Sequence, residues 1–412
     1  MRLNDKNIIL CITGSIAAYK AVYLASFFKK NGSNVYAVLT KNAAKFITPL
    51  TLKTITNNKV ITKMFDENDF IPHISLAELA DIIVVAPATA NIIAKAATGI
   101  ADDIVSSLLL SSTSPKIIVP AMNVNMYNNS ITQINIQILK DNGYHVMQPD
   151  EGYQACGVKG IGRFPEIDKI YSFILRSIYN KKSIFNNKKI LITIGGTIED
   201  IDPVRYISNR SSGRMGLAFA EELIYRGGKV DIIAGKVSDL LLNKFKSKFT
   251  DVKIEYIRSA KDLKNKIMSL DNYDIYIMAA AVADFTTIYN SNKIKKNSGI
   301  LSLPLEKTDD ILLTLQRDQN SIYIGFAAET DNLLENAWDK LNKKSLDFII
   351  ANIVGGNKSA IGSKKAEAYL LNRWEEKEYK FNFDNKEVIS SNILDKIEKI
   401  LKNFKLLEDI RV

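Results

Sequence analysis

The sequence predicts an α/β protein built from two doubly wound, Rossmann-like domains, and three observations favour this fold class. Short runs of Ile, Val and Leu alternate with helical patterns along most of the 412 residues, which is typical of strands buried in a parallel sheet. A polar segment rich in Asn and Lys, residues 179–189, interrupts the alternation. A chain of this length also exceeds one hydrophobic core. We therefore expect two domains, residues 1–189 and residues 190–412.

Each domain is expected to repeat a strand–helix unit. In the first, strands are predicted at residues 7–13, 34–40, 81–86 and 116–120, and helices at 17–31, 73–80, 90–99 and 130–142. In the second, strands are predicted at 190–194, 229–234, 253–257, 274–279, 321–326 and 348–351, and helices at 213–226 and 331–343. Because helices separate the strands, neighbouring strands should be parallel.

The composition excludes several classes of protein. The longest apolar stretches are too short to cross a bilayer, and the N-terminal residues lack the unbroken apolar region of a signal peptide. Cys11 and Cys156 are the only cysteines, too few for a disulfide framework. We expect a cytoplasmic protein without a membrane partner. The net charge of +10 favours the binding of anionic small molecules. Alternatively, it reflects lysines that are spread over the surface without forming a binding site. The short basic runs lack interleaved aromatics, so no nucleic acid partner is expected.

The first predicted strand ends in a turn that contains Gly14 and Ser15 and opens a helix. Backbone N–H groups at such a helix start bind phosphate, and Ser15 can add a hydroxyl donor. The turn lacks the spacing G-x-G-x-x-G, which favours a mononucleotide over NAD. An ordinary strand–helix turn is the alternative explanation.

Three side chains of the first half carry possible chemistry. His73 precedes a predicted helix, whose dipole would lower its pKa and keep the ring neutral as a base. Asn123 follows a strand, at the edge where α/β sheets bind ligands, although Asn is also a common turn residue. Cys156 lies in a loop with glycine, where a thiol can transfer a proton, whereas Cys11 is expected to be buried filler. Taken alone, each has an ordinary structural explanation.

Together these residues lie in fragments that resemble one family. The fragments GSIAAYK, AKFITPLTL, APATANIIAK, PAMNVNMY and QACG are similar, in order and spacing, to the FMN-dependent phosphopantothenoylcysteine decarboxylases over about residues 8–163. The resemblance implies a flavodoxin-like domain that binds FMN. The FMN contacts that it implies are Gly14, Ser15, Ile16, Thr40, Thr89, Ala90, Asn91 and Ala121.

The same resemblance implies a mechanism and an assembly. Oxidation of the substrate thiol to a thioaldehyde supplies an electron sink for loss of carbon dioxide. His73 assists removal of the first proton, Asn123 binds the carboxylate of the substrate, and Cys156 protonates the enethiolate that remains after carbon dioxide has left. Flavin sites of this family form between subunits, so a trimer-based homo-oligomer is expected.

The second half contains its own candidate anion site. Ser211, Ser212 and Gly213 offer N–H and hydroxyl donors at a predicted helix start, although ordinary capping explains them equally. Residues 279–283 are small and allow close approach of a ligand. The polar, lysine-containing stretch 289–298 is either a lid that closes over phosphates or a solvated loop.

The strings DPVRYISN, SSGRMG, AAAVADF, NKIKK and GFAAET look like the phosphopantothenate–cysteine ligases, over about residues 190–352. This family activates the carboxylate of 4′-phosphopantothenate with CTP and Mg²⁺ as an acyl-cytidylate, which the amine of cysteine then attacks. Both resemblances together imply a bifunctional enzyme of coenzyme A biosynthesis whose ligase domain forms dimers.

The resemblance also implies the ligase residues. Asn209 binds the acyl-cytidylate intermediate, and Lys293 neutralises the negative charge on the phosphate that is being transferred. No protein ligand is predicted for Mg²⁺, which the CTP phosphates mainly hold. The implied CTP contacts are Met278, Ala279, Ala280, Asp284, Lys293, Asp309, Asp310, Ile311, Leu312, Phe326, Lys340 and Lys344.

Two positions depart from the ligase pattern. Ile198 stands where the family usually has Arg, which removes a possible anion contact. Thr308, Asp309 and Asp310 stand where the family has Asn-Pro-Asp, which alters a turn at the nucleotide and adds a negative charge.

Two other functions would each require a different set of residues. A flavin-binding regulator without decarboxylase activity would lack the His or the Cys. An NAD-dependent oxidoreductase would need G-x-G-x-x-G. The sequence matches neither expectation.

Overall fold

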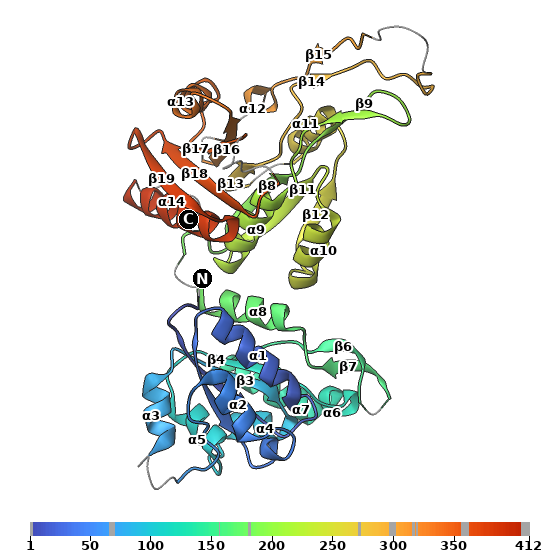
Figure 1. Ribbon diagram of the computed structural model, residues 1–412. Helices are drawn as coiled ribbons and strands as arrows, with labels where there is room; N and C mark the ends of the chain where they lie inside the picture. Colours follow the sequence, from blue (N-terminus) through green and yellow to red (C-terminus); the bar gives the residue numbers. More distant parts are fainter. Residues whose placement is uncertain are drawn as a thin grey trace. The chain divides into compact units, whose positions relative to one another are not determined.

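The computed structural model describes residues 3–65, 71–155, 157–179, 183–270, 273–295, 302–314, 318, 320–355 and 362–404. The chain divides into two compact units, unit 1 with residues 1–178 and unit 2 with residues 179–412 (Figure 1). Each unit has its own sheet and its own hydrophobic core. Among the described residues, no helix is both long enough and apolar enough to cross a membrane.

Unit 1 contains a five-stranded parallel sheet in the order β2-β1-β3-β4-β5. Its strands are β1 (Asn7–Ile12), β2 (Asn34–Leu39), β3 (Ile82–Ala88), β4 (Lys116–Pro120) and β5 (His145–Val146). This is the flavodoxin-like order, in which the chain direction across the sheet reverses between β1 and β3 and ligands bind beyond the carboxyl ends of the strands. The predicted fold class is therefore confirmed for this unit.

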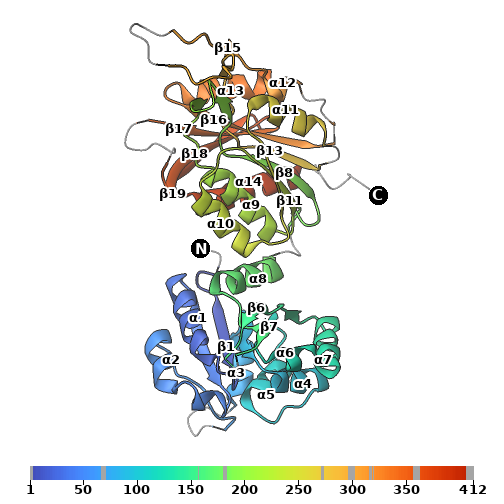
Figure 2. The same cartoon turned by 90° about the vertical axis from the view of Figure 1, so that its right-hand side faces the viewer.

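Helices cover both faces of this sheet (Figure 2). Ile9 and Cys11 point to the face that packs against α3, α4, α5 and α7. On the other face, α1 and α8 meet through the rings of Phe27 and Tyr171, whose centroids are 5.2 Å apart. The helices are α1 (Ala18–Lys30), α2 (Pro49–Thr56), α3 (Pro72–Leu79), α4 (Ala90–Thr98), α5 (Ile104–Ser111), α6 (Val124–Asn128), α7 (Ser130–Asp141) and α8 (Ile167–Tyr179).

A β-hairpin stands apart from the main sheet of unit 1. Its strands, β6 (Asp150–Tyr153) and β7 (Lys159–Arg163), are antiparallel. The sequence did not predict this hairpin, because its strands are short and rich in Gly and charged residues.

Unit 2 contains an eight-stranded sheet in the order β12-β11-β8-β13-β16-β17-β18-β19. The first six strands are parallel and follow the Rossmann order, so the reversal falls between β8 and β13. The last two strands add an antiparallel edge. The strands are β8 (Lys189–Ile194), β11 (Lys229–Ala234), β12 (Lys253–Tyr256), β13 (Ile275–Met278), β16 (Ile322–Glu329), β17 (Phe348–Ile353), β18 (Lys365–Asn372) and β19 (Lys377–Asn385).

Two helical layers cover this sheet. Figure 1 shows α11, α12 and α13 on one face of unit 2 and α9 and α14 on the other. The helices are α9 (Arg214–Tyr225), α10 (Asp239–Lys248), α11 (Ala260–Met268), α12 (Ile311–Thr314), α13 (Leu333–Lys343) and α14 (Lys386–Asn403). Short strand pairs β9 (Ile198–Asp200) with β10 (Tyr206–Ser208) and β14 (Phe285–Thr286) with β15 (Glu306–Lys307) lie outside the main sheet.

The first described residues after the gap at 180–182 pack onto unit 2. Phe185 is completely buried, and Glu398 on α14 accepts hydrogen bonds from the Ser183 hydroxyl and the Ile184 N–H, both at 3.1 Å. Arg226 donates to Glu398 at 3.0 Å and to Glu222 at 2.8 Å. Residues 183–189 of the polar segment 179–189 are therefore an integral part of unit 2.

Candidate functional site

The carboxyl ends of β1 and β3 in unit 1 are joined by the Thr13 hydroxyl. It donates to the Pro87 carbonyl at 2.7 Å and accepts from the Thr89 N–H at 3.1 Å. Gly14 follows, where a Cβ would lie only 2.5 Å from the Cβ of Asn42, so only glycine fits the turn without a shift of that neighbour. Packing and side-chain hydrogen bonds thus shape the two loops at the reversal point of the sheet.

The residues expected to contact FMN all lie at this edge of the sheet. They follow the ends of four adjacent strands. Gly14, Ser15 and Ile16 follow β1, Thr40 follows β2, Thr89, Ala90 and Asn91 follow β3, and Ala121 follows β4. The Ser15 hydroxyl accepts from the Ala17 N–H at 3.2 Å, just before α1 begins. Three hydroxyl groups and a helix N-terminus at one edge form a donor set that fits a phosphorylated mononucleotide.

The hairpin β6–β7 packs against the segment that contains Asn123. The Gln154 side chain accepts from the Val124 N–H at 3.1 Å and donates to the Met122 carbonyl at 3.3 Å. A Cβ at Gly160 would lie 2.7 Å from Val124, so the two segments are in close contact. Cys156 itself lies outside the described residues. The turn that flanks it is closed by a hydrogen bond of 2.9 Å from residue 157 N–H to residue 154 carbonyl.

Asn123 caps the short helix α6, and its side-chain oxygen accepts from the Asn125 N–H at 2.9 Å. His73 lies in the first turn of α3. Its Nδ1 is buried and has no hydrogen-bond partner among the described residues. Figure 1 shows α3 and the hairpin β6–β7 at opposite sides of unit 1. A single copy of the chain therefore does not bring His73 and Asn123 together.

Cys11 has no exposed surface. Burial raises the pKa of its thiol far above the usual range, and Asp103 raises it further. The prediction that Cys11 is buried filler is confirmed, because a thiol that stays protonated in the core is inert.

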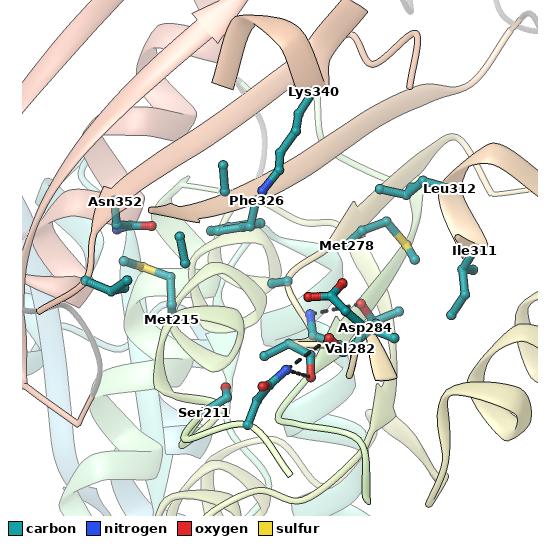
Figure 3. Close-up of a pocket in the computed structure, with 18 of the residues that line it drawn as sticks. Ser211, Met215, Met278, Val282, Asp284, Ile311, Leu312, Phe326, Lys340 and Asn352 are labelled. Atoms are coloured by element: carbon teal, nitrogen blue, oxygen red, sulfur yellow. Dashed lines mark hydrogen bonds between the residues drawn. The ribbon is translucent and has the colours of Figure 1, made fainter. Parts of the chain in front are cut away.

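Unit 2 contains a pocket of about 770 Å³ at the reversal point of its sheet (Figure 3). It lies at the ends of β8, β13 and β16 and continues to the start of α9, the edge where Rossmann-type sheets bind ligands. Its size falls in the range of small-molecule sites. Its described lining includes six Lys or Arg residues and three Asp residues, so the site favours anions.

Most residues expected to contact CTP line this pocket. They are Met278, Ala279, Ala280, Asp284, Asp309, Asp310, Ile311, Leu312, Phe326, Lys340 and Lys344. Asn209 lines it as well. Lys293 is not among the described lining residues and is exposed in the segment that follows β14.

Side chains fix the loop that follows β13. The Asn209 amide donates to the carbonyls of Ala281 and Val282 at 3.1 and 2.9 Å. Thr193 accepts from the Ala280 N–H at 3.2 Å, and Thr197 accepts from the Ala283 N–H at 2.9 Å. The backbone at the bottom of the pocket is therefore held in place from β8 and from the segment before α9.

Each of the two aspartates at the altered turn has a lysine partner. Lys264 pairs with Asp309 at 2.7 Å and lowers the pKa of that carboxyl, and Lys344 pairs with Asp310 at 2.8 Å. Asp310 also accepts from the Leu312 N–H at 3.1 Å. The charge added at Asp309 is thus balanced on the protein itself.

The segment with Lys293 is tethered at its base. Asp202 accepts from the Ile294 N–H at 3.1 Å, and Arg205 donates to the Ile294 carbonyl at 2.8 Å. Arg205 also forms an ion pair with Asp202 and holds the pKa of that carboxyl far below its usual value. Ile198 lies in β9 with its N–H bonded to the Arg258 carbonyl at 2.7 Å.

The sequence reasoning missed two buried polar residues of the pocket, Asn352 and Lys386. A signal for Lys386 exists in the sequence, because it lies in phase with Ile389, Ile393 and Ile397 on the apolar face of α14. A lysine at a core position of an amphipathic helix indicates a special role. No group of three or more potential metal-ligating side chains occurs in the described part of the chain.

The fold and the two sites define the class of this protein, and two family models match it. The Flavoprotein family covers residues 1–179, and the DNA/pantothenate metabolism flavoprotein C-terminal domain covers residues 185–401. The class is thus a flavoprotein unit joined to a Rossmann-type unit of pantothenate metabolism flavoproteins.

Curated relatives extend over nearly the whole chain. The coenzyme A biosynthesis bifunctional protein CoaBC of Bacillus subtilis (strain 168) is 42% identical over 368 residues, which are 88% of this chain and 89% of the relative. The protein of the same name from Borreliella burgdorferi is 41% identical over 405 residues, 96% and 99% of the two chains. A solved C-terminal domain of CoaBC is 31% identical, with TM-score 0.43, and covers 54% of this chain and all of that domain. The chain belongs to the family of bifunctional coenzyme A biosynthesis proteins, which confirms both resemblances seen in the sequence.

Proposed function

We propose that the chain catalyses two consecutive reactions of coenzyme A biosynthesis. Residues 190–412 join cysteine to 4′-phosphopantothenate through an acyl-cytidylate made from CTP, and residues 1–189 decarboxylate the product to 4′-phosphopantetheine with FMN. The observation that carries this proposal is that the residues expected to contact FMN lie at the carboxyl edge of the unit 1 sheet, and that eleven of the twelve expected CTP contacts line the pocket of unit 2. Family membership supports both activities. The substrates are metabolites of the cytoplasm, where we place the protein.

In the ligase reaction, the pocket of unit 2 holds CTP beside the acid. The substrate carboxylate attacks the α-phosphate, and pyrophosphate leaves. Lys293 closes over the pocket and balances the charge of the phosphate that is being transferred. Asn209 fixes the loop after β13 and holds the acyl-cytidylate, from which CMP leaves as the cysteine amine attacks the carbonyl carbon. Mg²⁺ would be held mainly by the CTP phosphates.

In the decarboxylation, the edge of the unit 1 sheet would hold FMN, which would supply the two-electron oxidation of the substrate thiol and the return of both electrons after carbon dioxide is lost, so that no other oxidant or reductant is consumed. Asn123 binds the carboxylate that is lost, and His73 accepts a proton at the start of the reaction. Cys156 returns a proton to the product. The buried Nδ1 of His73 has no partner among the described residues, so no described hydrogen bond of this nitrogen competes with a role in proton transfer.

We further propose that unit 1 forms a trimer in which one subunit supplies His73 and its neighbour supplies Asn123 and Cys156, while unit 2 dimerises. The separation of α3 from the hairpin β6–β7 within one copy supports this arrangement (Figure 1). Mixing provides the test. A His73→Asn variant and a Cys156→Ser variant, each unable alone to form 4′-phosphopantetheine, are co-expressed and assayed for formation of 4′-phosphopantetheine from 4′-phosphopantothenoylcysteine. Random mixing in a symmetric trimer should restore about a quarter of the sites. No recovery in mixed oligomers would contradict the shared site.

The central test is a coupled assay of the purified protein. We expect a yellow protein that converts 4′-phosphopantothenate, cysteine and CTP to 4′-phosphopantetheine with Mg²⁺, and that works better with CTP than with ATP. A colourless protein that does not regain colour with added FMN would contradict the decarboxylase. Absence of pyrophosphate release from CTP would contradict the ligase.

A further inference from the structure

The hairpin formed by β9 and β10 contacts the segment that contains Lys293 at several points, and the proposed reaction gives this hairpin no role. The segment begins directly after Asp284, which lines the pocket of unit 2 (Figure 3). It pairs with residues 306 and 307 through β14 and then extends to Lys293. Because β14 and β15 lie outside the main sheet, contacts beyond that sheet decide where Lys293 lies.

Two contacts join the hairpin to this segment on the N-terminal side of Lys293. The Thr286 hydroxyl donates to the Glu199 carboxylate at 3.2 Å. The Asn290 N–H donates to the Ile201 carbonyl at 2.9 Å. Glu199 is only 5% exposed, so the first of these contacts is shielded from water. The segment therefore follows the hairpin from its start.

Asp202 holds the residue that directly follows Lys293. Its side chain has no exposed surface, and its two oxygens have different partners. Oδ1 accepts from the N–H groups of Val204 and Arg205, both at 2.8 Å, and so stabilises its own turn. Oδ2 accepts from the Ile294 N–H at 3.1 Å and from the Arg205 guanidinium at 3.0 Å. Since Arg205 also donates to the Ile294 carbonyl at 2.8 Å, both backbone groups of Ile294 are bonded to the hairpin.

We propose that Asp202 is a positioning residue of the ligase, which holds the backbone beside Lys293 so that the ammonium group reaches the phosphate that is being transferred. This inference rests on the proposed function. The Lys293 side chain is exposed, so its direction depends on the backbone to which it is attached. A cation stabilises a transition state best when it is already in place, and Asp202 supplies this order through Ile294.

Asp202→Asn separates the two functions of this side chain. Asparagine can keep its oxygen toward its own turn, and it then presents an NH₂ group, which accepts no hydrogen bond, to Ile294 and Arg205. We expect the rate of pyrophosphate release at saturating CTP to fall about 10- to 100-fold, because small misplacements of reacting groups are costly. The KM for CTP should rise no more than about threefold, since the other expected CTP contacts are untouched.

A double-variant cycle tests whether Asp202 acts through Lys293. Pyrophosphate release is measured in a single turnover, with the full-length protein in excess over CTP. Once Lys293→Gln has removed the ammonium group, Asp202→Asn should slow this release by less than about a further twofold. A residue that only stabilises the fold would lower the rate by the same factor with and without Lys293. Equal factors would therefore overturn the inference.

Limited proteolysis of the full-length protein measures the tether without any substrate. Trypsin cuts after lysine, and the bond between Lys293 and Ile294 includes the N–H group that Asp202 holds. Asp202→Asn should speed this cut by about 10-fold or more, because protection decreases with the free energy of local opening. Mass spectrometry identifies the fragment that begins at Ile294. An unchanged cleavage rate would show that Asp202 does not hold the segment, and would also overturn the inference.

The matched control is Asp200→Asn in the same hairpin. Asp200 forms an ion pair with the exposed Arg258 at 2.6 Å, so this variant should change neither the rate of pyrophosphate release nor the cleavage after Lys293. Equal losses in the Asp200 and Asp202 variants would show a general disturbance of the hairpin and contradict the specific role of Asp202. Both tryptophans of the chain lie in unit 2, so tryptophan fluorescence reports on the folding of this unit in each variant.

Failure of the proposed function gives a different result. If the unmodified protein releases no pyrophosphate from CTP, the proposed ligase activity is wrong and the positioning role of Asp202 falls with it. In that case the unmodified protein is itself inactive. In every other outcome it is active, and only the Asp202 variant decides the inference.

Discussion

At the scale of single residues, a neighbouring lysine changes the effect on CTP binding that the charge of Asp309 is expected to have. The ligases that this chain resembles carry proline at this position, so the sequence alone predicts an unfavourable negative charge beside CTP. In the structure, Lys264 pairs with Asp309 at 2.7 Å and lowers the pKa of its carboxyl. The pair presents no net charge to the nucleotide.

Removal of this partner should therefore expose the charge. We expect Lys264→Ala to raise the KM for CTP about two- to fivefold, the range of exposed ion pairs. The double variant with Asp309→Asn should return the KM to its original value. Pyrophosphate release at varied CTP concentration gives the measurement, and Lys261→Ala on the same helix is the control. Equal KM values in the Lys264→Ala variant and the unmodified protein would mean that Asp309 is too far from the nucleotide to affect it.

At the scale of elements, the hairpin β6–β7 depends on Gln154 for its position. This side chain bonds to residues 122 and 124 of the PAMN segment and to the Ile161 carbonyl of its own hairpin, at 3.1 to 3.3 Å. Gln154 therefore holds the hairpin beside the segment with Asn123. A shift of the hairpin should disturb the proposed decarboxylase site.

Gln154→Leu removes these hydrogen bonds while it roughly preserves the size of the side chain. We expect decarboxylation to slow by about 100-fold, because small misplacements of reacting groups are costly, and ligase activity to remain unchanged. Gln137→Leu, an exposed position on α7, is the control. Carbon dioxide release and pyrophosphate release are measured on the same sample. Parallel loss of both activities would show general unfolding and contradict the positioning role.

The contact between α9 and α14 depends on a buried ion-pair network. Arg226 is 6% exposed and bonds to Glu222 and Glu398. Arg226→Leu leaves two partly or fully buried carboxylates without this cation, so it should lower the free energy of unfolding of unit 2 by about 3–5 kcal/mol. Lys343→Leu breaks an exposed pair with Asp339 and should cost about 0–1 kcal/mol. Urea unfolding followed by tryptophan fluorescence separates the two results.

The same network predicts how the stability of unit 2 depends on pH. Burial acts to raise the pKa of Glu398, but hydrogen bonds from Lys402 and the Ile184 N–H, with the charge of Arg226, lower it overall. A lowered carboxyl pKa in the folded state stabilises the protein above the unfolded value, here 4.5, and this contribution is lost as pH falls below it. The urea concentration at the unfolding midpoint should therefore decrease as the pH is lowered below about 4.5. Glu398→Gln should reduce this dependence, and an unchanged slope would contradict the assignment.

At the scale of the whole molecule, the two sites lie in separate units with separate sheets and cores. Cys156→Ser should therefore block formation of 4′-phosphopantetheine and leave pyrophosphate release intact. Lys293→Gln should block pyrophosphate release, because it removes the cation expected at the transferring phosphate, and should leave the decarboxylation of added 4′-phosphopantothenoylcysteine intact. The two product assays on each variant give the measurement. Equal loss of both activities in either variant would contradict independent sites.

The sequence by itself determined the α/β class, the family, and the parallel strands of both sheets except β5. These follow from local patterns: continuous apolar runs mark buried parallel strands, and β1, β2 and β8 differ from their predicted bounds by only one residue at either end. The sequence missed the antiparallel edge β18–β19 and the hairpin β6–β7, because their strands contain many polar residues and are recognised only by what they pair with.

The tertiary structure decided which of these residues meet. Sheet order brings segments more than a hundred positions apart to one pocket in unit 2, from Thr193 to Lys386, and no local pattern specifies that order. It also supplied the partner of Asp309, the tether of the Lys293 segment and the burial of Lys386. Charge and hydrogen bonding act through distance in space, so these properties exist only once the chain is folded. Local propensity therefore gave the elements, and packing gave the sites.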